Sequence, residues 1–319
     1  MRKAVSAALV VLALASFVRA QNLTSTLAQV SSEYGKAYVA PAVDAFGMDM
    51  NSGLFHGASM SGLLPLGLHV YVGVQIGTAL IQSSDKSFNA SYADTLYDPI
   101  LGKQPATFTV TNAPTIYGSS DKGKAVITPT NPLYPTDSLS TIGGLINASL
   151  VPLPIPQVGI GSLFGTDVMV RYLPEIKLSD YGKVQLFGVA VRHSISQYIP
   201  LVPIDIAVQV GFQSLSVTDS SGGDLMKAST FAANIEVSKT FLMLTLYGGL
   251  QMESSSVDVK YTYNPGQNFQ PVNVSFSLKG KNKFRALAGL SFALGPVLIN
   301  GDYSFGSMSA VTLGLGIAI

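Results

Sequence analysis

The stretch that decides the fold runs from Ile204 to Gln213 and reads Ile-Asp-Ile-Ala-Val-Gln-Val-Gly-Phe-Gln. Every second residue, beginning with Ile204, is apolar, and the residues between them are polar or small. A period of two places the two sets on opposite faces of a β-strand. The stretch therefore predicts a strand with one apolar face and one polar face.

The same alternation recurs along most of the chain and predicts an all-β protein. Nine strands are predicted in this way, at 68–80, 160–173, 184–193, 204–216, 228–239, 241–253, 272–291 (long enough to be split), 296–305 and 310–319. Adding Leu54–Met60 and one or two strands from 99–156 gives ten to fourteen. Twelve is the preferred number, because bacterial outer-membrane barrels use even counts.

Composition excludes several classes of protein. The chain has 319 residues, 19 Lys plus Arg against 18 Asp plus Glu, and no Cys. Nucleic-acid binding is not expected, since it requires a basic face. Without cysteine there is no disulfide framework, no thiolate metal site and no cysteine nucleophile. Charged residues make up 12% of the chain, about half of the roughly 25% usual for soluble domains.

The first twenty residues have the layout of a secretory signal peptide. Arg2 and Lys3 precede an apolar run from Ala4 to Phe17, and Val18-Arg19-Ala20 forms a cleavage site before Gln21. The mature chain is therefore expected to be exported.

The polar faces, the apolar faces and the connections together predict a closed transmembrane barrel. The apolar faces carry no charge, and an Arg or Lys on a lipid face costs about 2–4 kcal/mol near the midplane. Short turns alternate with long connections, as in bacterial outer-membrane barrels. Because lipid cannot satisfy a free sheet edge, the sheet must close on itself. An exported soluble sandwich or barrel is the alternative.

Two segments depart from the strand pattern. Residues 21–52 carry a helical stripe that includes Tyr34 and Tyr38, and Pro41 and Gly47 are expected to end the helix. This segment is either a plug or latch in the barrel mouth or an amphipathic lead-in on the periplasmic face, with the barrel itself at 53–319. Residues 82–157 are rich in proline and predict a long irregular region holding one or two strands, at Thr107–Thr111 and Leu139–Leu150.

Charged and amide side chains on the polar faces are expected to line the lumen. These residues are His69, Asp167, Arg171, Arg192, Asp205, Gln209, Glu236, Gln251, Glu253, Arg285 and Asp302. The three histidines, His56, His69 and His193, do not have the spacing of a helical metal site. No catalytic residue, metal site or cofactor is predicted.

The organisation of the chain resembles the outer-membrane barrels of the long-chain fatty-acid transporter (FadL) type, or an uncharacterised family of similar bacterial proteins. The resemblance lies in a signal peptide, the motifs Tyr34-Gly35-Lys36-Ala37-Tyr38 and Asn51-Ser52-Gly53-Leu54, and alternating strands to the last residue. It implies an N-terminal hatch inside the barrel and hydrophobic substrates that enter from outside and leave sideways through the wall.

The expected function is passive uptake of small hydrophobic molecules by a non-enzymatic barrel in the outer membrane of a Gram-negative bacterium. The expected partners are outer-membrane lipid, a small hydrophobic ligand and the barrel-assembly machinery. Two other hypotheses stay open: a structural or adhesive barrel with a plugged lumen, and an outer-membrane hydrolase centred on His69.

Overall fold

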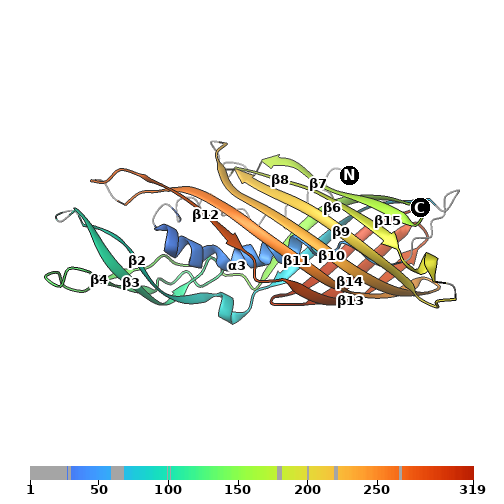
Figure 1. The fold of residues 1–319 in the computed structure, drawn as a ribbon, viewed down its shortest axis with the longest axis horizontal. Coiled ribbons are helices and arrows are strands. Elements are labelled where there is room, and N and C mark those ends of the chain that lie inside the picture. Colours follow the sequence, from blue (N-terminus) through green and yellow to red (C-terminus); the bar gives the residue numbers. More distant parts are fainter. Residues whose placement is uncertain are drawn as a thin grey trace.

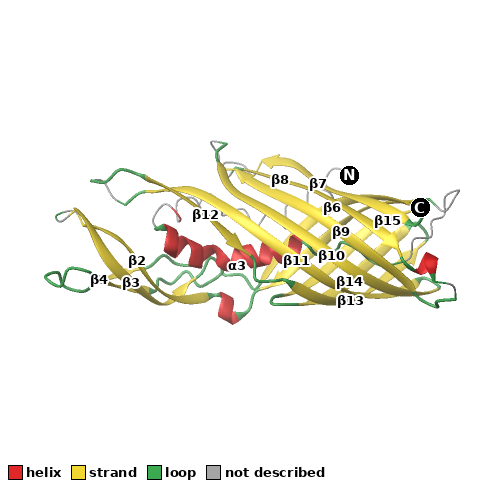
Figure 2. Ribbon diagram, in the orientation of Figure 1, coloured by secondary structure: helices red, strands yellow, loops and turns green. Residues whose placement is uncertain are grey.

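Ten antiparallel strands close into a barrel in the computed structural model (Figures 1 and 2). The structure describes residues 27, 30–58, 68–98, 100, 102–177, 182–199, 201–218, 222–265 and 268–319. The predicted signal peptide lies outside these residues. The predicted all-β, closed antiparallel architecture is confirmed.

Each barrel strand pairs with its two neighbours around the ring, and β1 pairs with both β15 and β6. In ring order the strands are β1 (His69–Leu80), β6 (Leu150–Leu163), β7 (Thr166–Lys177), β8 (Lys183–Ser194), β9 (Asp205–Thr218), β10 (Asp224–Phe241), β11 (Leu244–Tyr263), β13 (Phe284–Leu294), β14 (Val297–Phe305) and β15 (Ser309–Ala318).

The ten barrel strands described fall within the predicted ten to fourteen, although the preferred count of twelve is wrong. The segment 160–173 is a hairpin with a turn at Phe164–Gly165 rather than one strand. Residues 54–58 form no strand, and residues 59–60 lie outside the described part of the chain. The segment 272–291 is split, as anticipated, into β12 (Val272–Lys279) and β13.

In the part of the wall around the plug, the apolar residues of the barrel strands face outward and the polar residues face inward; nearer helix α3 the inward residues are apolar as well. On β9, Val208, Val210 and Phe212 are exposed, while Gln209 and Gln213 are buried inside the ring. A sandwich would hide the apolar set between two sheets, so the sandwich alternative is wrong. The outer surface is a belt of aliphatic and aromatic side chains.

Helix α3 (Ser32–Met50) lies in one mouth of the barrel, where it contacts β1, β6, β10 and β11 of the wall and also β12 (Figure 1). The predicted break at Pro41 and Gly47 is wrong, because the helix continues through both residues. Tyr38, Val43 and Met48 are buried in one apolar cluster with the inner faces of the wall. This burial outweighs the hydrogen bond that Pro41 cannot donate. Among the described helices, none is long and apolar enough to cross a bilayer.

A second sheet stands at the same end, beyond the barrel (Figure 1). Its strands are β2 (Ser87–Asp98), β3 (Gly102–Pro114), β4 (Lys124–Pro129) and β5 (Asp137–Ser140), paired in that order. The expectation of a mostly irregular region at 82–157 is therefore wrong. Its last prolines belong to β6, a barrel strand that begins ten residues earlier than 160.

The wall has a break in its ladder between β6 and β7. From Gln157 to Ile160, β6 pairs with Arg171 to Val168 of β7, but residues 150–156 of β6 have no described pairing on that side. On the other side, residues 150–156 pair continuously with β1. We call the unpaired stretch between β6 and β7 the ladder gap.

Three prolines at alternate positions explain the ladder gap. Strand residues of one parity bond to one neighbour, and each antiparallel bridge needs amide donors on both strands. The continuous ladder with β1 therefore uses Val151, Leu153 and Ile155. Pro152, Pro154 and Pro156 turn their nitrogens toward β7 and have no hydrogen to donate.

The orientation of the faces predicts opposite outcomes for two arginines on one strand. Val208→Arg places a charge within the outer belt, and we expect it to destabilise the inserted barrel by about 2–4 kcal/mol. Ser216→Arg lies on the same face of β9 but beyond the apolar residues, and we expect assembly close to wild type. Heat-modifiable electrophoretic mobility of membrane fractions measures both. Equal tolerance of the two would contradict a lipid-facing belt.

Candidate functional site

The interior of the barrel is filled by the last residues of helix α3 and the segment that follows them. Eight strands give an interior that side chains can fill, whereas ten leave room for a piece of chain. Residues 48–58, which we call the plug segment, occupy this room, and Asn51, Ser52, Leu54 and Phe55 are all buried. The backbone carbonyls of this segment accept hydrogen bonds from side chains of the wall. The site is therefore a contact between plug carbonyls and wall donors.

Arg171 is the donor nearest to the ladder gap. It belongs to the last rung before the gap, where it pairs with Gln157, and its Nε donates to Gln157 Oε1 at 3.0 Å. Its terminal nitrogens donate to the carbonyls of Met50 at 2.9 Å and Ser52 at 2.7 Å. A further bond to Gln213 Oε1 measures 3.1 Å. Arg171 thus connects the plug segment to the edge of the gap.

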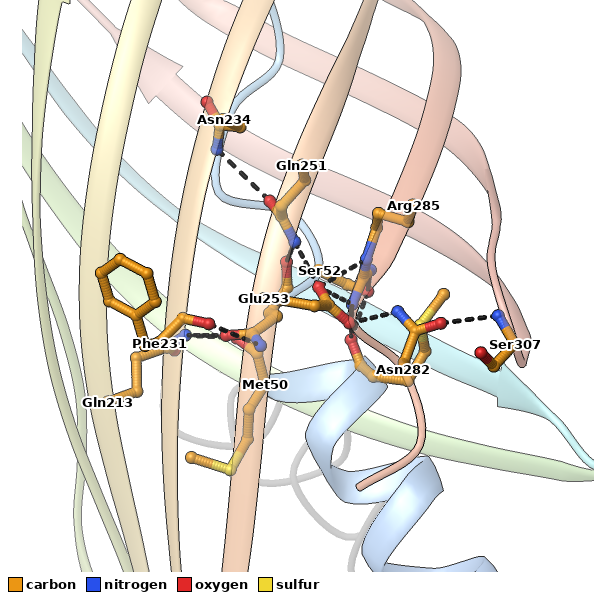
Figure 3. A network of polar contacts seen from close by, with 12 residues as sticks. Met50, Ser52, Gln213, Phe231, Asn234, Gln251, Glu253, Asn282, Arg285 and Ser307 are labelled. Atoms are coloured by element: carbon orange, nitrogen blue, oxygen red, sulfur yellow. Dashed lines mark hydrogen bonds and ion pairs between the residues drawn. The ribbon is translucent and has the colours of Figure 1, made fainter. Parts of the chain in front are cut away.

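Arg285 and Glu253 form a buried ion pair that also holds the plug segment (Figure 3). Arg285 Nε donates to Glu253 Oε2 at 2.7 Å, and Nη2 donates to Oε1 at 2.8 Å. The guanidinium reaches the Met48 carbonyl at 2.9 Å and Ser52 Oγ at 2.8 Å. Gln251 and Asn282 donate to the same carboxylate, so both charges are fully hydrogen-bonded.

Arg192 anchors the far end of the plug segment. Its guanidinium donates to Asp167 Oδ2, with Nε at 3.1 Å, and Nη1 donates to the Gly57 carbonyl at 2.6 Å. Glu236 lies 3.6 Å from the guanidinium, and His69 Nε2 lies 3.5 Å from Asp167 Oδ2. The cluster brings together four residues from four strands.

Amide side chains complete the contact between wall and plug. Gln251 Nε2 donates to the Asn51 carbonyl at 3.1 Å, and Gln209 Nε2 donates to the Leu54 carbonyl at 3.2 Å. Asn234 joins these two amides: its side chain donates to Gln209 Oε1 at 3.2 Å. It also donates to Gln251 Oε1 at 3.3 Å (Figure 3). The backbone carbonyls of Asn51 and Leu54 thus accept hydrogen bonds from amide side chains of the wall.

The plug segment carries little charge of its own. Its ionisable side chains are Asp49 and His56. The wall therefore holds the plug by hydrogen bonds to the backbone rather than by ion pairs.

Most of the residues predicted to line the lumen point into the ring. The buried ones are Asp167, Arg171, Arg192, Gln209, Glu236, Gln251, Glu253, Arg285 and Asp302. His69 is partly exposed beside Asp167, and Asp205 is partly exposed at the barrel end. Asp302 stands apart from the arginines and accepts a hydrogen bond from Tyr247 at 3.0 Å.

Several residues of the network were not predicted. Gln75, Gln157, Gln213 and Asn300 are buried on the same inner faces, and Gln75 and Asn300 bond to each other. Their position on the polar parity of a strand was the available signal, since Gln75 and Gln213 lie in the two clearest alternating stretches. The plug carbonyls could not be predicted from residue types, because every residue has a backbone carbonyl.

A cavity of about 260 Å³ lies between the plug segment and the end of the barrel with the short turns. Leu54 and His56 of the plug line it, together with His69, Asp167 and Arg192 of the wall. Within the described ranges, no three histidine or carboxylate side chains come together as a metal site. The cavity is the free volume that borders the plug.

Removing one member of the buried ion pair should be costly. We expect Arg285→Met to destabilise the folded barrel by about 3–5 kcal/mol, because Glu253 stays buried without its counter-ion. Lys183→Met is the matched control. It removes an exposed pair with Glu175 at 2.9 Å, worth about 0–1 kcal/mol. Urea unfolding in detergent micelles compares the two midpoints. Similar midpoints would contradict the assigned burial of Glu253.

Comparisons with known proteins give a family but no function. No curated protein matches the sequence. Similar solved structures include Salmonella typhi OmpF in complex with daunomycin (8% identity, 79% of this chain, 97% of that chain, TM-score 0.21). The β domain of the Bordetella autotransporter BrkA (11%, 78%, 98%, 0.24) and the CymD monoaromatic hydrocarbon channel (10%, 86%, 93%, 0.23) are two more. Likenesses this weak carry no argument. Over residues 1–319 the sequence matches the family described as "Family of unknown function (DUF6588)", and the chain belongs to that family.

Proposed function

We propose that this chain is a non-enzymatic outer-membrane barrel that passes small hydrophobic molecules from outside into the membrane. The plug segment is its gate, and the ladder gap between β6 and β7 is its exit. The ladder gap is the observation on which the proposal depends. Outer-membrane lipid and the barrel-assembly machinery are the partners that such a protein needs.

The outer belt supports a location in the membrane. Val208, Ile235 and Leu315 are 38–55% exposed on three different strands, and no described part of the chain covers them. In water such a surface would be an aggregation hazard, since soluble monomers rarely expose large apolar patches. In lipid the same surface is favourable, and the closed ring leaves few backbone groups unpaired.

The ladder gap supports a sideways route for apolar molecules. Parting two paired strands in lipid would break several hydrogen bonds, each costing several kcal/mol. At the gap these bonds are already absent. The inner face beside it is apolar, because Val151, Leu153 and Ile155 are buried in the same cluster as helix α3. The lower end of the gap borders Val158 and Val170 of the outer belt.

Arg171 supports a coupling between the gate and the exit. One guanidinium binds the last rung of the β6–β7 ladder and two carbonyls of the plug segment. Movement of the plug would therefore release the residue that fixes the corner of the gap. The resemblance to the FadL type implies a hatch and a sideways exit of this general kind.

The exit is tested by restoring the missing donors. In the triple variant Pro152→Val, Pro154→Val and Pro156→Val, three amide hydrogens face β7 and can extend the ladder. We expect uptake of a fluorescent fatty acid by liposomes to fall to the level of protein-free liposomes, while assembly is retained. Pro296→Val, in the turn between β13 and β14, is the control and should leave uptake unchanged. Full uptake by the triple variant would remove the assigned exit.

The gate is tested by loosening the plug. Arg171→Met removes hydrogen bonds to neutral amides and carbonyls. Because it leaves no buried carboxylate without a counter-ion, the barrel should still assemble. We expect uptake to rise several-fold over wild type, with Lys183→Met as an exposed control. If wild type and both variants all give no uptake in assembled form, the structural, plugged-barrel hypothesis takes its place.

A further inference from the structure

We propose that the short-turn rim of the barrel is immersed in the lipid of the adjacent, inner leaflet instead of standing in water. The short-turn rim comprises the connections β6–β7, β8–β9, β10–β11 and β13–β14, at 164–165, 195–204, 242–243 and 295–296. The inference rests on the proposed membrane location but not on transport, plug or exit.

Three turns of the rim display a large apolar side chain from a left-handed backbone. Phe164, Leu201 and Leu242 have φ of 51°, 63° and 56°, and each is between 91% and 101% exposed. Left-handed positions normally go to Gly, Asn or Asp, because a bulky side chain there is disfavoured. Among the described residues no contact compensates for the choice, since the three side chains are almost fully exposed. Their environment must lie outside the protein.

The fourth turn, between β13 and β14, also carries exposed apolar side chains, but its left-handed residue is a glycine. Gly295 supplies the left-handed residue, with φ of 58°, and Leu294 and Val297 on either side of the turn are exposed. The η4 turn (Ser196–Tyr198) in the β8–β9 connection adds Tyr198 and Ile199, which are also exposed. Every described connection at this end thus presents apolar side chains.

The distribution around the ring identifies the partner. The four connections lie at intervals around the circumference, because each joins a different pair of neighbouring strands. A protein partner would cover one side of the rim, whereas lipid surrounds it on all sides. The rim also continues the outer belt: Leu246 and Val237 lie on the strands that Leu242 joins, and both are exposed. A lipid surface is the one partner that matches this arrangement.

Charge agrees with this partner. Of the charged side chains described near this end, Asp167, Arg192 and Glu236 point inward. The Lys239 ammonium is not free either, since it donates to the Pro203 carbonyl. Asp205 lies on the inner parity of β9 and is only partly exposed. The described outward face of the rim is therefore almost free of uncompensated charge.

The apolar belt extends along the strands as far as the turns of the rim. On β11 the outward apolar residues run from Leu244 to Met252, and Ser254 follows. Nine residues at about 3.3 Å each, tilted by about 40°, span roughly 23 Å along the membrane normal. The apolar band of outer-membrane barrels is about 25 Å tall. On β13 the exposed apolar residues run from Phe284 to Leu294, so the apolar band reaches the turn at 295–296.

The chain has no tryptophan, so single introduced tryptophans report their surroundings without background. Phe164→Trp and Leu242→Trp probe the rim at two independent turns. Leu315→Trp probes the belt, and Asp121→Trp probes an exposed loop at the opposite end. Each variant is reconstituted into phosphatidylcholine vesicles with or without bromine on the acyl chains, and iodide serves as the aqueous quencher. Heat-modifiable mobility verifies assembly of each variant.

We expect both rim tryptophans to lose at least half of their fluorescence in brominated lipid, as Leu315→Trp does, and to resist iodide. Asp121→Trp should behave in the opposite way. If the rim tryptophans respond to iodide like Asp121→Trp while Leu315→Trp is quenched by bromine, the rim stands in water and the inference is wrong. If Leu315→Trp also escapes bromine, the membrane location itself is wrong.

Discussion

The whole structure depends on one constraint, that the backbone of the wall must find its hydrogen-bond partners within the protein. Ten strands satisfy it by closing into a ring, with β1 joining β15 to β6. Closure gives every strand an outer and an inner face, and around the plug the apolar residues lie outside and the polar residues inside. At the ladder gap the hydrogen bonds between β6 and β7 are missing. Pro152, Pro154 and Pro156 have no amide hydrogen to donate on that edge of β6.

The interior answers the same constraint in a different way. A loop inside a barrel carries carbonyls that no strand pairs, and an unpaired buried carbonyl is costly. Arginine suits this task because its fixed fork of donors can serve several acceptors at once. Arg171, Arg192 and Arg285 each bind the plug backbone while satisfying a wall partner. The three guanidiniums therefore stabilise the wall and position the plug through the same bonds.

Much of this was predictable from the sequence, and the failures have physical causes. The alternation around Val208 and Gln209 assigns the outer and inner faces correctly, and it places Arg171 and Arg285 inside. It fails at 160–173, because the ladder shifts register between Ile160 and Leu163, so that even-numbered residues stay outward across the turn. The rule that proline excludes a strand fails at β6, which contains Pro152, Pro154 and Pro156. Local propensity also failed at Pro41, since burial in the barrel mouth maintains the helix. The hydrogen-bonded plug depends on backbone carbonyls, which every residue has.

The path of the chain through the ring constrains how the protein is made. Val30 lies at the outer end of β11, where its carbonyl accepts a bond from Tyr261, whereas Ala58 bonds to Ser238 near the β10–β11 turn at the opposite end. Residues 30–58 therefore traverse the lumen from one mouth to the other. Sliding a 19-residue helix through a finished, filled ring would require every guanidinium–carbonyl bond to be absent at once. The strands are better assembled around residues 30–58, so the last two strands of the barrel pair only after this segment is in place.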